Sequence, residues 1–168
     1  SFPLTVTSFE NGTFNDVITV LIALGDVSGH GLGAALYTTT AHAILHQQLR
    51  AKAAPDAAFA TLNVSLAETH SGRFMTAAMI DLDASSGRFV YASAGHNPLL
   101  WIKAGKPIWL NSTGIPLGIM AAGTVTLSPE QQMAEGDVLV LYTDGITEAN
   151  NGSDEQYGEP RLAEVVAA

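Results

Sequence analysis

The sequence contains no cysteine, which excludes a disulfide framework, a thiolate nucleophile and a cysteine-based zinc site. It is also poor in positive charge, with 7 Lys and Arg against 16 Asp and Glu and a formal net charge of −9. The basic residues form no cluster. Because binding to a phosphate backbone needs such a cluster, we expect no nucleic-acid partner.

A long hydrophobic run is absent as well. The longest, residues 17–24, is far too short to span a bilayer, and residues 1–7 lack the basic start and apolar stretch of a signal peptide. We therefore expect no membrane insertion by this domain and a cytoplasmic location, a reducing compartment that suits a chain without cysteine.

The residues that are present indicate a globular fold. A length of 168 residues with 47% apolar residues suits a single domain over residues 1–168 with a sizeable core. Apolar runs and turn signals predict strands at residues 17–24, 73–82, 88–94, 99–103, 107–110, 124–127 and 138–142. Helices are predicted at residues 34–52 and 55–69 and from residue 160, whereas residues 1–16 show no clear period. This order predicts an α+β fold in which helices cover a β core.

Helical spacing also predicts which faces are buried. In the first helix, the apolar residues that lie roughly on one side are Leu36, Ala43, Ile44 and Leu49. In the second, Phe59, Leu62 and Leu66 form a stripe, and Pro55 suits the first turn.

Two of the predicted buried strands run into an aspartate next to a glycine. VLIAL is followed by Gly25 and Asp26, and VLVLY by Thr143, Asp144 and Gly145. An aspartate at the end of a buried strand is held by rigid backbone, and carboxylate oxygens suit Mg²⁺ or Mn²⁺. The alternative is that each aspartate caps a turn or the next helix.

The glycine-rich stretch 26–33, DVSGHGLG, lies between the first strand and the first helix. It matches neither the P-loop nor the dinucleotide-binding glycine motif, which disfavours nucleotide binding through them. A loop that holds an acid, a serine and a histidine against a helix start suits metal or phosphate. Ser28 and His30 also permit half of a hydrolytic triad, but Ser28 lacks the nucleophile-elbow motif.

Five segments in order resemble the metal-dependent type 2C protein phosphatases, also called the PPM family. They are DVSGHGLGAAL (26–36), FMTAAMIDLD (74–83), SAGHNPLLW (93–101), GIPLGI (114–119) and LVLYTDGITEA (139–149). The resemblance spans about residues 17–165 and is closest to the bacterial branch of sporulation and stress-response phosphatases that control sigma factors.

The resemblance implies a four-layer αββα sandwich, in which an antiparallel β-sandwich is flanked by helices and binds two Mn²⁺ or Mg²⁺ ions. It implies that Asp26 bridges both ions, that the backbone carbonyl of Val27 binds one of them, and that Asp144 binds the other. It further implies that a hydroxide bridging the two metals attacks phosphoserine or phosphothreonine directly. The implied substrate is a phosphorylated regulatory protein of the anti-sigma-factor antagonist type, and a sensor domain often precedes such domains.

The sequence departs from the family pattern in two places. The family's G-G-D-x-x-D element before the first strand is missing, and Glu10 and Asp16 are poor substitutes for its acid. The family's terminal Asp-Asp-x-Thr strand is also missing, and Asp154 and Glu155 do not match it. We therefore expect a phosphatase domain whose N-terminal metal motif and C-terminal strand are incomplete in residues 1–168. The alternative is a degenerate, non-catalytic module that uses the fold to bind a regulatory partner.

Other polar residues have less specific interpretations. His30 either positions phosphate or water or bonds the backbone, whereas His96 and Asn97 are expected to shape a turn. His42 and His46 form an i, i+4 pair, a spacing that can bind metal. They lack the intervening glutamate of a metalloprotease helix, so we expect them on the polar face of the first helix. Thr143 and Glu148, which flank Asp144, are expected to support hydrogen bonds or a helix cap.

Overall fold

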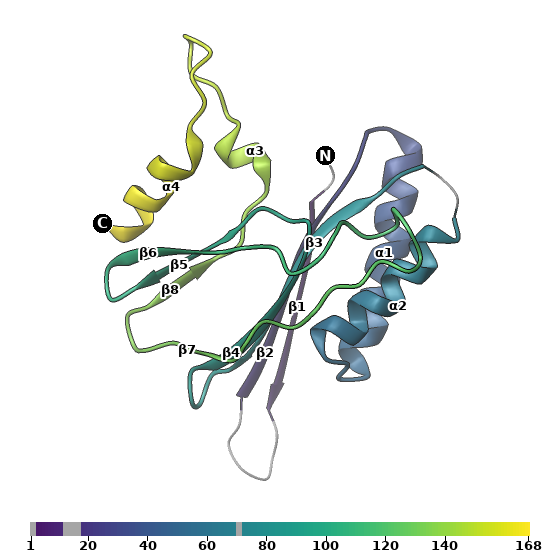
Figure 1. The fold of residues 1–168 in the computed structure, drawn as a ribbon, viewed down its shortest axis with the longest axis horizontal. Coiled ribbons are helices and arrows are strands. Elements are labelled where there is room, and N and C mark those ends of the chain that lie inside the picture. Colours follow the sequence, from purple (N-terminus) through teal and green to yellow (C-terminus); the bar gives the residue numbers. More distant parts are fainter. Residues whose placement is uncertain (1–2, 12–17, 70–71) are drawn as a thin grey trace. The chain divides into compact units, whose positions relative to one another are not determined.

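The structure is a computed structural model that describes residues 3–11, 18–69 and 72–168. The chain forms two compact units, one comprising Ser1–His96 and Ser112–Gln132 and the other Asn97–Asn111 and Met133–Ala168. The positions of the units relative to one another are not determined (Figure 1). The organisation of residues 1–168 as a single phosphatase domain therefore stays a prediction.

The first unit contains a five-stranded antiparallel sheet with the strand order β1-β2-β3-β4-β7. Its strands are β1 (Pro3–Asn11), β2 (Ile18–Val27), β3 (Met75–Asp83), β4 (Arg88–Ala94) and β7 (Gln131–Gln132). Two helices, α1 (Leu32–Arg50) and α2 (Pro55–Ala67), pack together against one face of this sheet (Figure 1). The core of the unit lies between these helices and the sheet.

Helix α2 forms as the sequence predicts. Pro55 occupies its start, where the missing backbone N–H removes no helical hydrogen bond. The stripe of Phe59, Leu62 and Leu66 is fully buried in the core. Burial of these three side chains therefore fixes the face that α2 presents to the sheet.

The predicted face of α1 is wrong in part. Leu49 is buried, but Leu36 is 60% exposed and Ala43 is also exposed. The residues that α1 buries are Ala34, Tyr37, Ala41, Leu45 and Leu49. Apolar residues occur on more than one side of this helix, so their spacing alone does not select the side that meets the sheet.

The second unit contains a three-stranded antiparallel sheet with the order β6-β5-β8. Its elements are β5 (Leu99–Lys103), β6 (Lys106–Leu110), β8 (Val138–Val140), α3 (Asp144–Thr147) and α4 (Gly158–Ala167). The predicted turn between β5 and β6 is present, because Ala104 and Gly105 both have positive φ, 48° and 75°. Two such residues form the tight turn whose twist matches a hairpin. The core of this unit joins β5, the segment after β8 and α4, through Leu100, Ile102, Tyr142, Leu162 and Ala163.

The antiparallel sheets and the helices confirm the α+β class, with several corrections to the predicted elements. Residues 124–127 do not form an edge strand, because only Val125 makes an isolated bridge, to Gly114. The edge strand next to β4 is β7 instead. The start of the chain, which has no clear period, forms β1 by pairing with β2. Helix α4 begins at residue 158 and not at Pro160.

None of the helices among the described residues has the length and apolar character that crossing a bilayer requires.

Candidate metal site

The sequence predicts Asp26 just beyond the end of a strand, and this is wrong, because Asp26 lies within β2. Strand β2 continues through Val27, and Asp26 is paired with Pro3 of β1 and with Thr76 of β3. Alternate residues of β2 from Leu21 to Val27 are buried with the helices, so Asp26 projects from the opposite face of the sheet. Pairing on both sides gives this carboxylate a fixed position.

The carboxylate of Asp26 fits a metal ion. Its Oδ1 atom is shielded from solvent and has no hydrogen-bond partner among the described residues. A buried charged oxygen without a partner is costly, and a divalent cation is a ligand that removes this cost. The Oδ1 atom of Asp26 accepts no hydrogen bond from the described residues and is therefore available to coordinate a hard cation.

Val27 is the second predicted ligand, and its backbone carbonyl is directed away from β3. Met75 lies opposite Val27 in β3, but the N–H and C=O of Met75 bond to Leu117 at 2.9 and 2.8 Å. Hydrogen bonds in an antiparallel pair alternate along the strands, so the Val27 carbonyl points away from β3. The described residues of β1 reach only as far as Pro3, opposite Asp26. No described residue of either neighbouring strand therefore bonds this carbonyl as part of the ladder.

The loop after Val27 is tied to the start of β3. The Ser28 N–H donates to the carbonyl of Phe74 at 2.9 Å, and the Phe74 N–H donates to the Ser28 hydroxyl oxygen at 3.0 Å. Gly29 and Gly31 have φ values of 88° and 79°, which side chains strongly disfavour. Ser28 thus holds the loop in place, while His30 is exposed. This arrangement gives no support to a Ser28–His30 hydrolytic pair.

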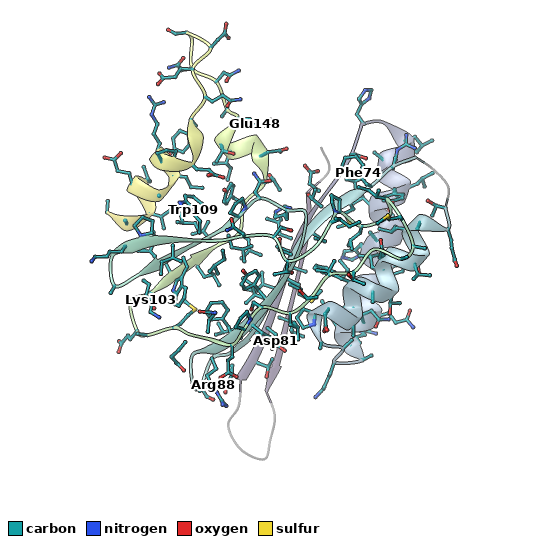
Figure 2. All side chains as sticks on the ribbon, in the orientation of Figure 1. Phe74, Asp81, Arg88, Lys103, Trp109 and Glu148 are labelled. Carbon is teal, nitrogen blue, oxygen red and sulfur yellow. The ribbon has the colours of Figure 1, made fainter. Side chains whose placement is uncertain are left out.

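A positive charge lies beside the same loop. The guanidinium of Arg73 packs against Gly33 at the start of α1, where an added Cβ would lie 2.7 Å from a guanidinium nitrogen. The cationic group therefore lies close to the backbone at the first turn of α1. Phe74, the next residue, lies at one end of the first sheet, and Asp81 and Arg88 lie toward the other end (Figure 2).

His96 follows β4 and is 4% exposed. Its Nδ1 atom lies 3.0 Å from the hydroxyl of Thr76, the residue opposite Asp26. The preceding Gly95 has a φ of 62°, and its N–H donates to the carbonyl of Gly114. His96 therefore follows a backbone position that is fixed by hydrogen bonds, although residues 96–98 have no assigned turn, and its ring reaches the strand position that faces Asp26.

Asp144 lies in the second unit, at the start of the one-turn helix α3. Thr143 is the N-cap, and Asp144 is the first helical residue, so the carboxylate lies near the positive end of the helix. The Asp144 carbonyl accepts hydrogen bonds from the N–H of Glu148 at 2.7 Å and the hydroxyl of Thr147 at 3.3 Å. The side chain of Thr143 makes no cap hydrogen bond, and Glu148 is exposed.

The sequence-predicted ligands thus fall into two groups. Asp26 and Val27 are neighbours in the first unit, whereas Asp144 belongs to the second, and the structure does not determine the distance between them. Within the described ranges, no group of three or more His, Asp or Glu side chains that could hold a metal ion occurs. Glu10 is part of β1, and Asp16 lies outside the described residues.

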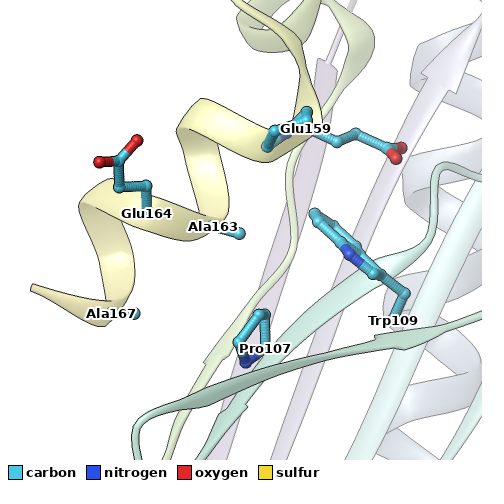
Figure 3. A pocket seen from close by; sticks show the side chains of 7 residues that line it. Pro107, Trp109, Glu159, Ala163, Glu164 and Ala167 are labelled. Atoms are coloured by element: carbon cyan, nitrogen blue, oxygen red, sulfur yellow. The ribbon is translucent and has the colours of Figure 1, made fainter.

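The other candidates lie apart from Asp26. His42 and His46 are exposed on α1 and stack on each other with ring centroids 6.1 Å apart. A pocket of about 420 Å³ lies in the second unit between β6 and α4 (Figure 3). It is lined by Pro107, Trp109, Glu159, Pro160, Ala163, Glu164 and Ala167, none of which is a predicted site residue. This pocket therefore does not coincide with the predicted site.

Sequence analysis missed Thr76. Threonine is an ordinary strand residue, and its relevance depends on the register that places it opposite Asp26. The only available signal was its position inside the family segment FMTAAMIDLD.

Comparisons with known proteins place these observations in a family context. The sequence pattern described as "Stage II sporulation protein E (SpoIIE)" matches residues 17–168. Phosphoserine phosphatase RsbP of Bacillus subtilis (strain 168) is 30% identical over 131 residues, which cover 74% of this chain and 32% of RsbP.

Solved structures show the same fold. The RsbU and RsbW domains of Rv1364c from Mycobacterium tuberculosis match with a TM-score of 0.76 and 25% identity, covering 98% of this chain and 45% of that one. The SiaA-PP2C domain of Pseudomonas aeruginosa matches with a TM-score of 0.77 and 21% identity, covering 99% and 70%. The chain spans less than half the length of RsbP and of the Rv1364c chain.

Proposed function

Because the chain belongs to the SpoIIE family of PP2C-like phosphatases, we propose that it is a metal-dependent protein serine/threonine phosphatase. The observation that carries the proposal is the buried Oδ1 of Asp26, which has no hydrogen-bond partner among the described residues. The resemblance assigns the metal site to this aspartate, and the geometry of β2 leaves the same atom available. Asp26, the Val27 carbonyl and Asp144 are the proposed ligands of two Mn²⁺ or Mg²⁺ ions.

The metal ions, when bound, supply a water nucleophile that is active at neutral pH and stabilise charge on the phosphoryl oxygens. The protein residues hold the geometry. Asp26 is fixed by pairing with strands on both sides, and Ser28 anchors the following loop to Phe74. Arg73, packed beside that loop, offers a guanidinium to the dianionic phosphate. This cation matters because the chain as a whole carries a net charge of −9.

The proposed substrate is phosphoserine or phosphothreonine on a small regulatory protein of the anti-sigma-factor antagonist type. Support comes from RsbP, which is named a phosphoserine phosphatase. Regulators of this type act on transcription, so the proposed place of the reaction is the cytoplasm. A sensor domain attached to the phosphatase is part of the same proposal.

The test is phosphate release from a phosphoserine protein in the presence of Mn²⁺. We expect activity in the wild type and a loss of at least about a hundredfold in Asp26→Asn, because the variant removes a charged ligand but keeps the shape. Equal phosphate release by the two proteins would refute the assignment of Asp26.

A non-catalytic binding module is the second candidate. It is favoured by the absence of a cluster of three acidic or histidine side chains among the described residues and by the missing G-G-D-x-x-D element. Calorimetric titration with Mn²⁺ separates the two functions. Stoichiometric binding that is lost in Asp144→Asn supports the enzyme, whereas no metal binding together with a stable, phosphorylation-independent complex supports the module.

A further inference from the structure

Asp26 lacks a hydrogen bond that its neighbour across the sheet is able to offer. Thr76 lies directly opposite Asp26 in the antiparallel register. Side chains of such a pair project from the same face, with Cβ atoms about 4.5–5.5 Å apart. A threonine hydroxyl at this range is a natural donor to a buried carboxylate. Nevertheless, the Asp26 Oδ1 atom has no hydrogen-bond partner among the described residues.

The hydroxyl of Thr76 has a different partner, the imidazole of His96. The Thr76 hydroxyl lies 3.0 Å from Nδ1 of His96, whose side chain is buried. A hydroxyl has one proton to donate, so a Thr76 that donates to His96 has none for Asp26. The opposite direction, with Nδ1–H donating to Thr76, would release the threonine proton toward the carboxylate.

The backbone just before His96 is held firmly. The N–H of Gly95 donates to the carbonyl of Gly114 at 2.9 Å and also to the hydroxyl of Ser112 at 2.7 Å. Gly95 has a φ of 62°, and an added Cβ would clash with Pro116. The imidazole is therefore presented to Thr76 by a backbone with little freedom to adjust.

We propose that His96 is a positioning residue for the metal site. Its Nδ1 atom accepts the Thr76 proton, which keeps the hydroxyl off Asp26 and leaves the carboxylate to a divalent cation. The neutral ring then carries its own proton on Nε2. This inference rests on the proposed function, because it assumes that Asp26 binds metal.

The test is a calorimetric Mn²⁺ titration of the 168-residue chain and of three variants, each checked for folding by circular dichroism. His96→Phe keeps the bulk of the ring but removes the acceptor, so Thr76 turns to Asp26. We expect Mn²⁺ affinity to fall roughly tenfold to a hundredfold, the usual effect of losing a supporting group of a metal ligand. Thr76→Val removes the competing hydroxyl, and its affinity should stay within about threefold of wild type.

The double variant separates positioning from stability. If His96 acts by occupying the Thr76 hydroxyl, Thr76→Val should restore the affinity that His96→Phe loses. If His96 only stabilises the fold, the double variant should bind no better than His96→Phe. That second result, or wild-type affinity in His96→Phe, overturns the inference.

A measurement on the metal-free wild type is independent of whether the variants fold. In ¹⁵N-labelled protein, the His96 resonances should show Nδ1 unprotonated and Nε2 protonated; a protonated Nδ1 overturns the inference. Wild-type heat signals that persist in Asp26→Asn, or no Mn²⁺ binding by the wild type, would refute the proposed function and this inference with it. Binding that depends on Asp26 but not on His96 refutes the inference alone.

Discussion

Replacing Asn63 with leucine should destabilise the first unit by about 3 kcal/mol, because it removes about three hydrogen bonds of about 1 kcal/mol each. Asn63 is 3% exposed on α2. Its Nδ2 atom donates to the carbonyls of Met120, Ala121 and Gly123 at 3.0, 3.2 and 3.0 Å. Its Oδ1 atom accepts the N–H of Gly118 at 2.8 Å. One side chain thus bonds four backbone groups of residues 118–123, and the Met120 carbonyl also accepts the N–H of Gly123 at 2.9 Å.

The expected magnitude follows from the number of protons. An amide NH₂ has two protons to share among the three carbonyls, and its oxygen accepts one more bond. Three bonds at about 1 kcal/mol each give the expected loss, with more if the carbonyls stay buried without partners. For a chain of this size, that loss lowers the melting temperature by roughly 6–12 °C.

The assay must report on the correct unit. Both tryptophans, Trp101 and Trp109, lie in the second unit, so fluorescence does not follow the first. Far-UV circular dichroism during urea unfolding gives the free energy, and hydrogen exchange of the Gly118 amide reports the local contact. Ser65→Ala is the matched control, because Ser65 is a half-buried residue of α2 whose hydroxyl donates to the carbonyl of Thr61 within the same helix. An Asn63→Leu variant within about 0.5 kcal/mol of this control would refute the reasoning.

Three further predictions concern backbone strain and titration. Gly118→Ala should lower the free energy of unfolding by about 2 kcal/mol or more, because φ is 84° and the new Cβ would clash with the Tyr37 hydroxyl. The control is Gly152→Ala, whose new Cβ meets no atom within 4 Å and which should be nearly neutral in the same urea titration. Hydrogen bonds from serine side chains hold the pKa of the Asp83 carboxyl well below its usual range. Its contribution to stability is therefore present above about pH 4 and lost on acidification, so the melting temperatures of wild type and Asp83→Asn should converge as the pH falls. Burial raises the pKa of Tyr142, whose hydroxyl also donates to a glutamate carboxylate. Tyr142→Phe should be about 1 kcal/mol less stable at neutral pH, and tryptophan fluorescence should show this difference shrinking above about pH 10. A constant difference across either pH range would contradict the corresponding assignment.

The sequence predicted elements well where local signals agree. The Phe59, Leu62 and Leu66 stripe and the tight turn at Ala104 and Gly105 follow from periodicity and turn chemistry, and the structure confirms both. Prediction failed where a distant partner decides the outcome. Residues 124–127 have strand-like composition but make one isolated bridge, whereas residues 3–11 have little signal and form β1 because β2 pairs with them. The hydrogen bonds of a strand belong to its neighbour, so its existence depends on residues far away in the sequence.

For the candidate site, the sequence by itself determined the family segments and, through that resemblance, the prediction of Asp26, Val27 and Asp144 as ligands. Those assignments depend on residue order, which is local information. Only the tertiary structure decided that Asp26 lies inside a paired strand, that Thr76 faces it and that His96 reaches the Thr76 hydroxyl. The physical reason is that register and turn geometry bring together residues 26, 76 and 96, and no periodicity or motif encodes contacts across such separations.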